Sequence, residues 1–204
     1  MNTNTPNDDE MTRRMATGTA EDYFDPDAPP PNHGVEPDLE NLSQFNFAAE
    51  TAAELVAMLN DYANPCCCCT PTLAAEWQQN GRRVTLLDLD DRYATFGNFI
   101  QYDLRNPVFI NQHFDVIVAD PPFFLPQPVH HAITTLVGDS RPDLFLVFAA
   151  DQEDKLLALF ADWKLQPIDY QLRHHHVKAT HQNQFRLYGT APERFQNVKS
   201  MRKA

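Results

Sequence analysis

Hydrophobic positions along the chain follow two patterns, short continuous runs and runs with helical spacing. The continuous runs predict buried strands at about 66–69, 84–89, 99–102, 114–119 and 144–149. Helical spacing predicts helices over about 47–62, 71–79, 129–137 and 152–163. Two further β-rich stretches, about 166–173 and 184–190, follow each other with a histidine-rich connection and no helix between them. The chain therefore alternates strands with helices up to a β-rich C-terminal end.

This alternation predicts an α/β fold with a doubly wound, mostly parallel sheet covered on both faces. The last two strands are expected to form an antiparallel edge, because no helix separates them. Sheets of this kind bind ligands at the carboxyl ends of their strands. Those ends carry Thr70, Asp88, Asp103 and Asp120, so we expect the chemistry there.

The two ends of the chain differ in composition from its middle. Residues 1–41 hold ten acids and two arginines, and 25–31 combines like charges with prolines, which predicts a disordered tail over 1–40. We expect the folded domain over 41–195 and a flexible basic tail over 196–204. The polar N-terminus does not resemble a signal peptide, and no apolar run approaches the roughly 18 residues that span a bilayer. The sequence thus predicts a cytoplasmic protein without a membrane partner.

Charge bears on the kind of substrate. Hydrophobic residues make up 43% of the chain, which excludes a wholly disordered protein. Residues 42–204 hold 18 acids and 14 bases, so the predicted domain is mildly acidic. It lacks the basic excess that binding to a phosphate backbone usually requires, although a local basic patch is compatible with this average.

Two clusters of metal-binding residue types have simpler explanations. Cys66 to Cys69 are consecutive, and neighbours in a strand point to opposite faces, so the block cannot close a tetrahedral site. Four buried thiols of a reduced protein explain it. His174 to His176 and His181 suit a loop near the substrate entrance or a polar strand face better than a metal site. No metal is predicted.

The tetrapeptide Asp120-Pro121-Pro122-Phe123 follows directly after a buried strand. Two prolines restrict the chain, so the Asp120 carboxylate and the Pro121 carbonyl can converge on one point. Together they can accept both hydrogens of an amino group, and Phe123 adds an aromatic face. A plain turn is the alternative, because Asp-Pro is common after strands.

The tetrapeptide is similar to the catalytic motif of amino-group methyltransferases that use S-adenosylmethionine. Over most of 41–190 the chain resembles one family in that class, the lysine methyltransferases of eukaryotic elongation factor 1-alpha, historically labelled adenine-specific DNA methyltransferases. Five segments carry the resemblance in order: Leu42-Ser43-Gln44-Phe45 with Glu50-Thr51-Ala52, Asp90-Asp91-Arg92-Tyr93 with Phe96-Gly97, Tyr102-Asp103 with Asn106-Pro107, Asp120-Pro121-Pro122-Phe123, and Asn183-Gln184-Phe185-Arg186-Leu187. The zinc-knuckle ribosomal-RNA adenine methyltransferases share much of this pattern, but this chain lacks their cysteine-rich zinc modules. The resemblance implies a Rossmann-like class I methyltransferase fold.

The resemblance also implies cofactor-binding roles for the strand ends. Asp88 matches the acid that accepts hydrogen bonds from the ribose hydroxyls, and Asp103, with Tyr102 beside it, matches the acid near the adenine ring. Asp120 lies where cofactor and substrate meet. The first strand-to-helix turn is formed by Cys69, Thr70 and Pro71. This turn departs from the glycine-rich loop of many methyltransferases, since the chain has no glycine between Gly34 and Gly81.

Further residues are assigned to the substrate side. Ser43, Gln44 and Phe45 cover the cofactor or form a substrate lip, with the start of a helix as the alternative. Phe124 offers a stacking face beside Phe123, and Phe185 lines the active site from the closing strand. Arg186 either lines the site or pairs with an acid at the sheet edge.

Three functions are compatible with the motif. We favour methylation of a protein lysine on a translation elongation factor, because of the resemblance and the missing basic excess. Methylation of the adenine amino group in RNA or DNA is the second hypothesis, with an accessory subunit supplying the grip on the nucleic acid. A non-catalytic binding subunit with the same fold is the third, but it would tolerate loss of the strand-end acids, and Asp88, Asp103 and Asp120 are present.

Overall fold

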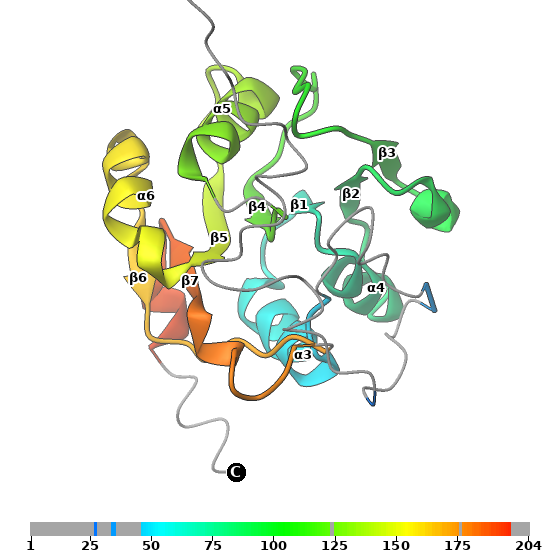
Figure 1. The fold of residues 1–204 in the computed structure, drawn as a ribbon. Coiled ribbons are helices and arrows are strands. Elements are labelled where there is room, and N and C mark those ends of the chain that lie inside the picture. The colour runs from blue at the N-terminus through cyan, green and yellow to red at the C-terminus, as the bar shows by residue number, and fades with distance from the viewer. Residues whose placement is uncertain (1–26, 28–33, 36–45, 123–124, 176, 197–204) are drawn as a thin grey trace, which may run out of the picture.

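A computed structural model of the chain describes residues 27, 34–35, 46–122, 125–175 and 177–196. Its centre is a seven-stranded sheet with strand order β3-β2-β1-β4-β5-β7-β6 (Figure 1). The strands are β1 (Pro65–Cys68), β2 (Thr85–Asp88), β3 (Phe99–Gln101), β4 (Val116–Ala119), β5 (Asp143–Ala149), β6 (Gln166–Ile168) and β7 (Phe185–Gly189). The predicted fold class, a class I methyltransferase sheet that is mostly parallel, is confirmed.

The strand directions agree with the prediction, and the structure also gives the order of the last two strands. The strands β3, β2, β1, β4 and β5 pair in parallel. The last strand, β7, inserts between β5 and β6 and runs antiparallel to both. The chain thus returns across the sheet before it ends, which places β7 against β5 rather than at the outer edge.

Helices cover both faces of the sheet. Figure 1 shows α3 (Ala49–Leu59) and α4 (Pro71–Gln79) on one side, and α5 (Pro126–Val137) and α6 (Glu153–Leu159) on the other. Each face buries its own apolar cluster. Cys67 packs in the cluster under α3 and α4, while Cys66 and Cys68 pack in the cluster under α5 and α6. Cys66 to Cys68 therefore form a buried strand whose side chains alternate between faces, as predicted, but the strand ends before Cys69, which is only half-buried.

Some elements are shorter than their periodicity suggests. The buried alternation of Ile168, Tyr170 and Leu172 predicts a long strand, but pairing in the sheet stops at Ile168. Tyr170 and Leu172 continue to bury themselves in the cluster under α3, beyond the end of the strand. Hydrophobic periodicity reports burial alone, so it looks the same for a strand paired in the sheet and for an extended segment outside it.

The predicted tails at 1–40 and 196–204 fall almost entirely outside the described residues, so their boundaries stay predictions. No helix in the described part of the chain is both long and apolar enough to cross a membrane.

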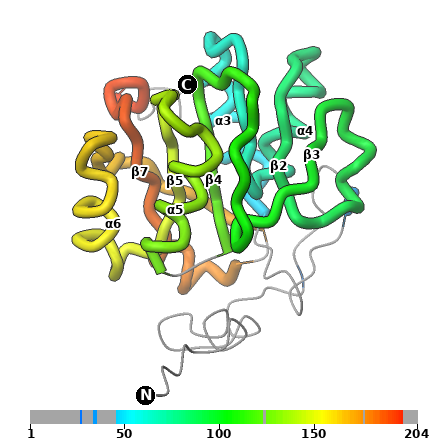
Figure 2. Tube along the Cα trace, turned by 90° about the horizontal axis from the view of Figure 1, so that it is seen from above, coloured from blue at the N-terminus to red at the C-terminus, as the bar shows by residue number. Residues whose placement is uncertain are grey.

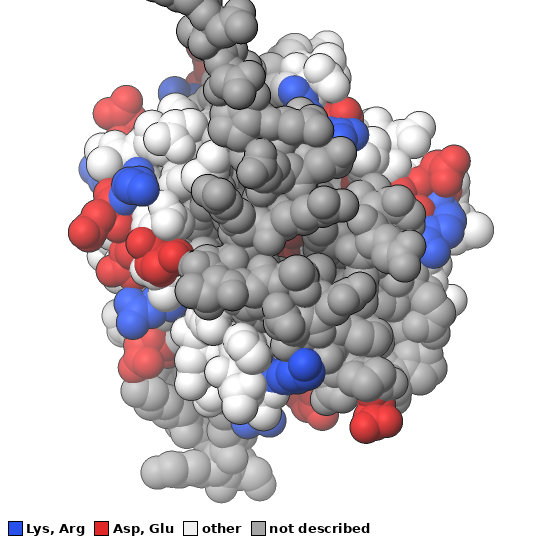
Figure 3. Space-filling view, in the orientation of Figure 1, with Lys and Arg blue, Asp and Glu red and all other residues white. Residues whose placement is uncertain are grey.

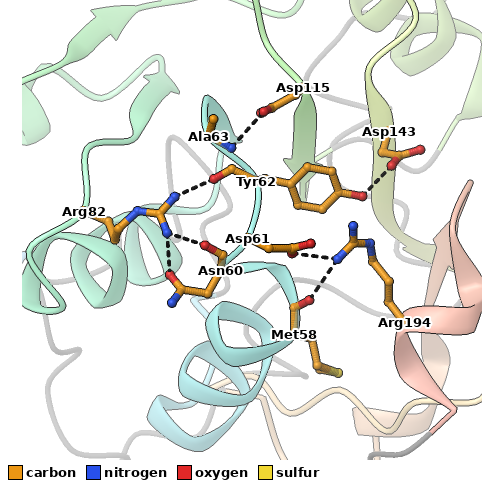
Figure 4. A network of polar contacts seen from close by, with 9 residues as sticks. All are labelled: Met58, Asn60, Asp61, Tyr62, Ala63, Arg82, Asp115, Asp143 and Arg194. Atoms are coloured by element: carbon orange, nitrogen blue, oxygen red, sulfur yellow. Dashed lines mark hydrogen bonds and ion pairs between the residues drawn. The ribbon is translucent and has the colours of Figure 1, made fainter.

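A polar network fixes the connection between α3 and β1 at the amino ends of the strands (Figure 4). The Tyr62 hydroxyl donates to Asp143 at the start of β5. Asp115, just before β4, accepts the backbone N–H groups of Ala63 and Asn64, each at 2.8 Å. This end of the sheet is consequently tied together by side chains that satisfy one another.

Two arginines complete the network in Figure 4. Arg82 donates to the carbonyls of Asn60 and Tyr62. Arg194 pairs with Asp61 at 2.7 Å, and its guanidinium lies 4.2 Å from the centre of the Tyr62 ring. Since both arginines hold the same short segment, the position of β1 is fixed from two sides.

Gly189 is required by a close approach at the antiparallel end of the sheet. A methyl group there would lie 2.7 Å from Ile168 Cδ1 and 2.7 Å from Phe145 Cδ1. We expect Gly189→Ala to lower the free energy of unfolding by about 1–3 kcal/mol, because the buried Phe145 ring cannot move aside freely. Urea unfolding measures the change. Gly97→Ala is the matched control, since no atom lies within 4 Å of its added carbon. Equal losses in both variants would contradict this account of Gly189.

Candidate active site

The carboxyl ends of three adjacent strands bring Cys69, Asp88 and Asp120 together. The order β2-β1-β4 makes them neighbours, and the backbone continues the ladder past the strand ends. Cys69 N–H donates to the Leu87 carbonyl at 2.8 Å, and Asp120 N–H donates to the Cys68 carbonyl at 3.1 Å. Three residues predicted from separate strands therefore share one edge of the sheet.

The turn after β1 does without glycine by placing Cys69 in the left-handed region, with φ of 56°. Thr70 is buried, and its hydroxyl donates to the Val118 carbonyl of β4 at 3.3 Å. Pro71 begins α4, a position where its missing N–H costs no helical hydrogen bond. The turn is thus rigid and closes against β4. Whether these three residues contact the cofactor stays a prediction.

The two acids act on the thiol of Cys69. A hydrogen bond with Cys68, then burial, then the nearby carboxyls of Asp88 and Asp120 raise the pKa of the Cys69 thiol well above its ordinary value. The thiol is therefore neutral at physiological pH. Because the thiol is neutral, the negative charge at this point comes from the carboxylates of Asp88 and Asp120.

Asp88 ends β2 as a carboxyl group that is only 6% exposed. Burial is the main cause that raises the pKa of Asp88 to about 7, although an N–H donated by Asp90 at 3.1 Å opposes the shift. A buried carboxylate with so few donors can accept further hydrogen bonds from a ligand. This is the chemistry that the ribose role predicts for Asp88, but the role itself stays a prediction.

Asp90 was missed as a site residue by sequence reasoning, which noted it only within the segment 90–93. Its buried carboxylate caps the short helix η1 (Asp91–Thr95) and pairs with Arg92, with Oδ2 at 2.6 Å from the guanidinium. The backbone of Asp90 in turn donates to Asp88. The Asp-x-Arg spacing is a signal for such a cap, and its effect here is to hold the loop beside Asp88.

Tyr102 and Asp103 organise the loop after β3. The Tyr102 hydroxyl donates to the Val108 carbonyl at 2.8 Å, and the ring is buried. Burial acts to raise the pKa of Asp103, but hydrogen bonds from Arg105 and Asn106 outweigh it and hold the pKa below its ordinary value. Asp103 thus stays ionised. Contact of either residue with the adenine ring stays a prediction.

Asp120 contacts a buried histidine directly. Its carboxylate is 15% exposed, and Oδ2 lies 2.9 Å from Nε2 of His174, a histidine that is 2% exposed. Burial raises the pKa of Asp120, and His174 opposes that shift. Pro121 is buried and Pro122 is half-buried beside it. Sequence reasoning placed the histidines near the substrate entrance, but nothing in the pattern indicated this pair.

The remaining predicted residues separate into two groups. The Phe185 ring packs edge-on against His174, with ring centres 5.3 Å apart, which brings it next to Asp120 through that histidine. Arg186 pairs instead with Glu153 at 2.9 Å, the alternative that the sequence left open. The other predicted residues, Ser43, Gln44, Phe45, Phe123 and Phe124, lie outside the described residues.

No group of three or more histidine, cysteine, aspartate or glutamate side chains in the described part of the chain could hold an ion.

Comparison with protein families identifies the chain. The family described as "Probable N6-adenine methyltransferase" matches residues 38–197. The chain belongs to this family. Among curated relatives, "EEF1A lysine methyltransferase 1" of Danio rerio is 27% identical over 163 residues, which cover 72% of this chain and 95% of that protein. "Protein-lysine N-methyltransferase M142.8" of Caenorhabditis elegans is 31% identical over 144 residues, or 59% of this chain and 66% of that protein.

Solved structures are more distant from this methyltransferase. A TehB-like SAM-dependent methyltransferase from Corynebacterium glutamicum is 16% identical, with a TM-score of 0.47 over 68% of this chain and 85% of that one. The predicted family, the enzyme class and the cofactor, S-adenosylmethionine, are confirmed by the family match. When bound, this cofactor supplies a methyl group on a positively charged sulfur.

The strand-end residues fit that cofactor chemically. Asp88 offers a buried acceptor for hydroxyl groups, and Asp103 offers an ionised one on the neighbouring strand end. Between Asp88 and Asp120 stands the neutral Cys69 turn rather than a charged group. We expect Asp88 to hold the ribose and Asp103 to orient the adenine.

We expect Asp88→Asn to separate cofactor binding from stability. The folded pKa of Asp88, about 7, lies above its unfolded value, so ionisation destabilises the free protein progressively as pH rises from about 4 through 7. The substituted amide carries no charge, and the free variant should therefore be more stable than the wild type at pH 8. Its Kd for S-adenosylhomocysteine should rise about 10- to 100-fold, as a charged hydrogen-bond acceptor is lost. Thermal unfolding against pH and calorimetric titration measure both effects. An unchanged Kd would remove Asp88 from the cofactor site.

Cys69 provides a test of the turn. We expect Cys69→Val to lower the free energy of unfolding by about 1–3 kcal/mol, because a β-branched residue is strained at positive φ. Cys69→Gly should cost less than about 1 kcal/mol, since glycine adopts this conformation without strain. Denaturant unfolding of both variants measures these changes in the free energy of unfolding. If glycine were the worse replacement, side-chain packing and not backbone conformation would determine the residue at 69.

Proposed function

We propose that this enzyme transfers a methyl group to a lysine side chain of a protein, a translation elongation factor of the 1-alpha type. The observation that carries the proposal is the match to relatives named as EEF1A lysine methyltransferases, one of which the chain spans over 95% of its length. The proposal assigns the two acceptors of the amine to the Asp120 carboxylate and the Pro121 carbonyl, as the motif predicts.

The geometry at Asp120 suits an amine that carries two hydrogens. His174 occupies Oδ2, while Oδ1 accepts no hydrogen bond from any described residue. An incoming amine can therefore donate one N–H to Oδ1, and we expect the other to go to the Pro121 carbonyl. These two bonds direct the nitrogen lone pair away from the acceptors, toward the side on which the methyl group is expected.

A lysine must lose a proton before it can attack. With an ordinary pKa near 10.4, only about one lysine in a few thousand is neutral at pH 7, which corresponds to roughly 4–5 kcal/mol. The buried surroundings of Asp120 act on the substrate as they act on Asp120 itself, by disfavouring charged forms. The proton leaves to solvent as the amine enters these buried surroundings. Burial at this edge thus assists the step that limits lysine as a nucleophile.

Adenine is the second candidate, and the family's description favours it directly. The same acceptors would hold the exocyclic amine of a flipped base. The described surface gives this reading less support. In Figure 3, lysines and arginines lie among acids on the face shown, and the arginines at 92, 105, 186 and 194 each pair with a carboxylate. Residues 42–204 hold 18 acids and 14 bases, so a phosphate backbone would meet no overall excess of positive charge.

The proposed substrate also sets location and partners. A translation factor is met in the cytoplasm, so we place the enzyme there. The elongation factor is the partner that the proposal requires, and an accessory subunit belongs to the adenine alternative.

Methyl transfer from radiolabelled cofactor tests the proposal. Purified elongation factor 1-alpha and total RNA are offered separately, and products are hydrolysed and identified by mass spectrometry. We expect methyl-lysine in the protein, with the rate reduced at least 100-fold in Asp120→Ala because the amine loses a charged acceptor. Methyladenosine in the RNA, with no label in protein, would make the adenine reading correct.

The matched control is Asp151→Asn, which changes an exposed carboxyl at the end of β5, on the same edge of the sheet. It should retain the wild-type rate. A loss equal to that of Asp120→Ala would mean that the effect follows from the net charge of this edge and not from the acceptor at 120.

A further inference from the structure

A long segment between β6 and β7 crosses the edge that carries the strand-end acids. Figure 1 shows the orange segment after β6 running toward α3, and Figure 2 shows it passing below the ends of β5 and β4. It brings His174 onto Asp120, a residue 54 positions away in sequence. The contact is therefore made by the fold and not by local geometry.

The backbone on both sides of His174 is paired with the segment that precedes α3. Phe47 and His174 form an antiparallel bridge. Ala48 N–H donates to the Arg173 carbonyl at 2.8 Å, and His175 N–H donates to the Asn46 carbonyl at 2.7 Å. Two segments from opposite ends of the domain hold one another over the site.

A glutamine fixes the same histidine from its other side. The Gln182 side chain accepts the His174 N–H at 2.8 Å and donates to the His174 carbonyl at 2.9 Å. The rings of Phe47 and Phe185 flank the imidazole, each with its centre 5.3 Å away. With backbone and ring both held, the imidazole has one orientation toward Asp120.

Burial then decides which nitrogen carries the proton. Nδ1 of His174 is buried and finds no hydrogen-bond partner among the described residues. An imidazolium would leave an N–H unpaired at Nδ1, which is more costly than an unpaired lone pair. The neutral ring with its proton on Nε2 satisfies the site, because Nε2–H then donates to Oδ2 of Asp120.

We propose that His174 is a positioning residue that holds Oδ2 of Asp120, so that Oδ1 and the Pro121 carbonyl face the substrate amine. This proposal rests on the proposed amino-group transfer. It assigns to the C-terminal segment a role in the reaction: a hydrogen bond from a rigid ring selects the rotamer of the acceptor and keeps it ionised. No bond to His174 forms or breaks during the transfer.

Few titratable groups face Asp120 in the described structure. His174 approaches from the segment after β6, and Cys69 approaches from the turn after β1 with a neutral thiol. Asp88 lies beyond Cys69 on β2. Loss of the His174 donor therefore changes the protonation of Asp120 with little compensation from neighbours.

The experiment compares His174→Leu, which fills space without a donor, with His174→Gln, whose amide can donate from the place of Nε2. We expect kcat to fall about 10- to 100-fold in His174→Leu and to recover largely in His174→Gln. The acid limb of the kcat profile should move to higher pH in His174→Leu, because Asp120 loses the donor that favours its charged form. Binding of S-adenosylhomocysteine should change less than about threefold in both.

His130→Leu is the matched control. His130 on α5 packs edge-on against Phe160, with ring centres 4.8 Å apart, and has no part in the site. It should leave kcat and the pH profile unchanged. Equal losses in His174→Leu and His174→Gln, or an acid limb that stays in place, would overturn the positioning role.

A second measurement works without a substrate and so separates this proposal from the proposed function. Ring-nitrogen NMR of histidine-labelled protein reports the protonation of His174, assigned by comparison with His174→Gln. We expect a neutral ring with hydrogen on Nε2 at pH 7. An imidazolium, or hydrogen on Nδ1, overturns the proposal even if lysine methylation is found. If the wild type methylates no protein, the proposed function fails and this spectrum still decides the role of His174.

Discussion

The parallel pairing of β2, β1 and β4 is the constraint on which the rest of the structure depends. The register places Cys68 beside Leu87 on one side and beside Ala119 on the other. The strands β2, β1 and β4 therefore end at the same level of the sheet. Two carboxyls and a thiol then lie close together, with Asp88 buried and Asp120 and Cys69 half-buried. The high pKa of Asp88 follows from that burial, and the pairing of Asp120 adds a contact from the segment after β6.

The carboxylates at the two ends of the strands differ in how many hydrogen bonds they accept. At the amino ends, Arg82, Arg194 and Asp115 satisfy the chain that enters β1, and the carboxylates there have donors. At the carboxyl ends, Asp88 has few donors, and Asp120 keeps one oxygen unoccupied by the described residues. Hydrogen bonds at the amino ends of the strands stabilise the fold. At the carboxyl ends, buried acceptors without donors lower the stability. Such a division is expected where a ligand completes the hydrogen bonding.

Much of the fold could be predicted from the sequence because its signals are local. Continuous apolar runs indicated the strands, and the cysteine block was correctly read as one of them, since alternation is a property of every strand. The acids at 88, 103 and 120 were found because strand ends are visible in the pattern. The order of β6 and β7 was not, because pairing across a sheet leaves no periodic signal.

His174 marks the limit of that approach. Its neighbours in sequence form a polar, histidine-rich run that suggests an exposed loop. It is buried because Phe47, from the segment before α3, and Gln182 and Phe185, from the stretch that leads into β7, surround it. Only the fold brings these together. Asp90 differs, because its partner Arg92 is two residues away and the capping pattern was present in the sequence.

The pairing of residues 46–48 with 173–175 has a consequence for the order of folding during synthesis. Thr51 and Arg173, joined by a 3.1 Å hydrogen bond, are 122 positions apart. Loops of this length close late, after local helices and neighbouring strands have formed. A chain still attached to the ribosome can therefore assemble β1 to β5 while its acids remain uncovered. We expect residues 173–175 to pair with 46–48 only after β7 has been synthesised and has joined the sheet. Until then, the carboxyl ends of β2, β1 and β4 lack the segment that brings His174 to Asp120.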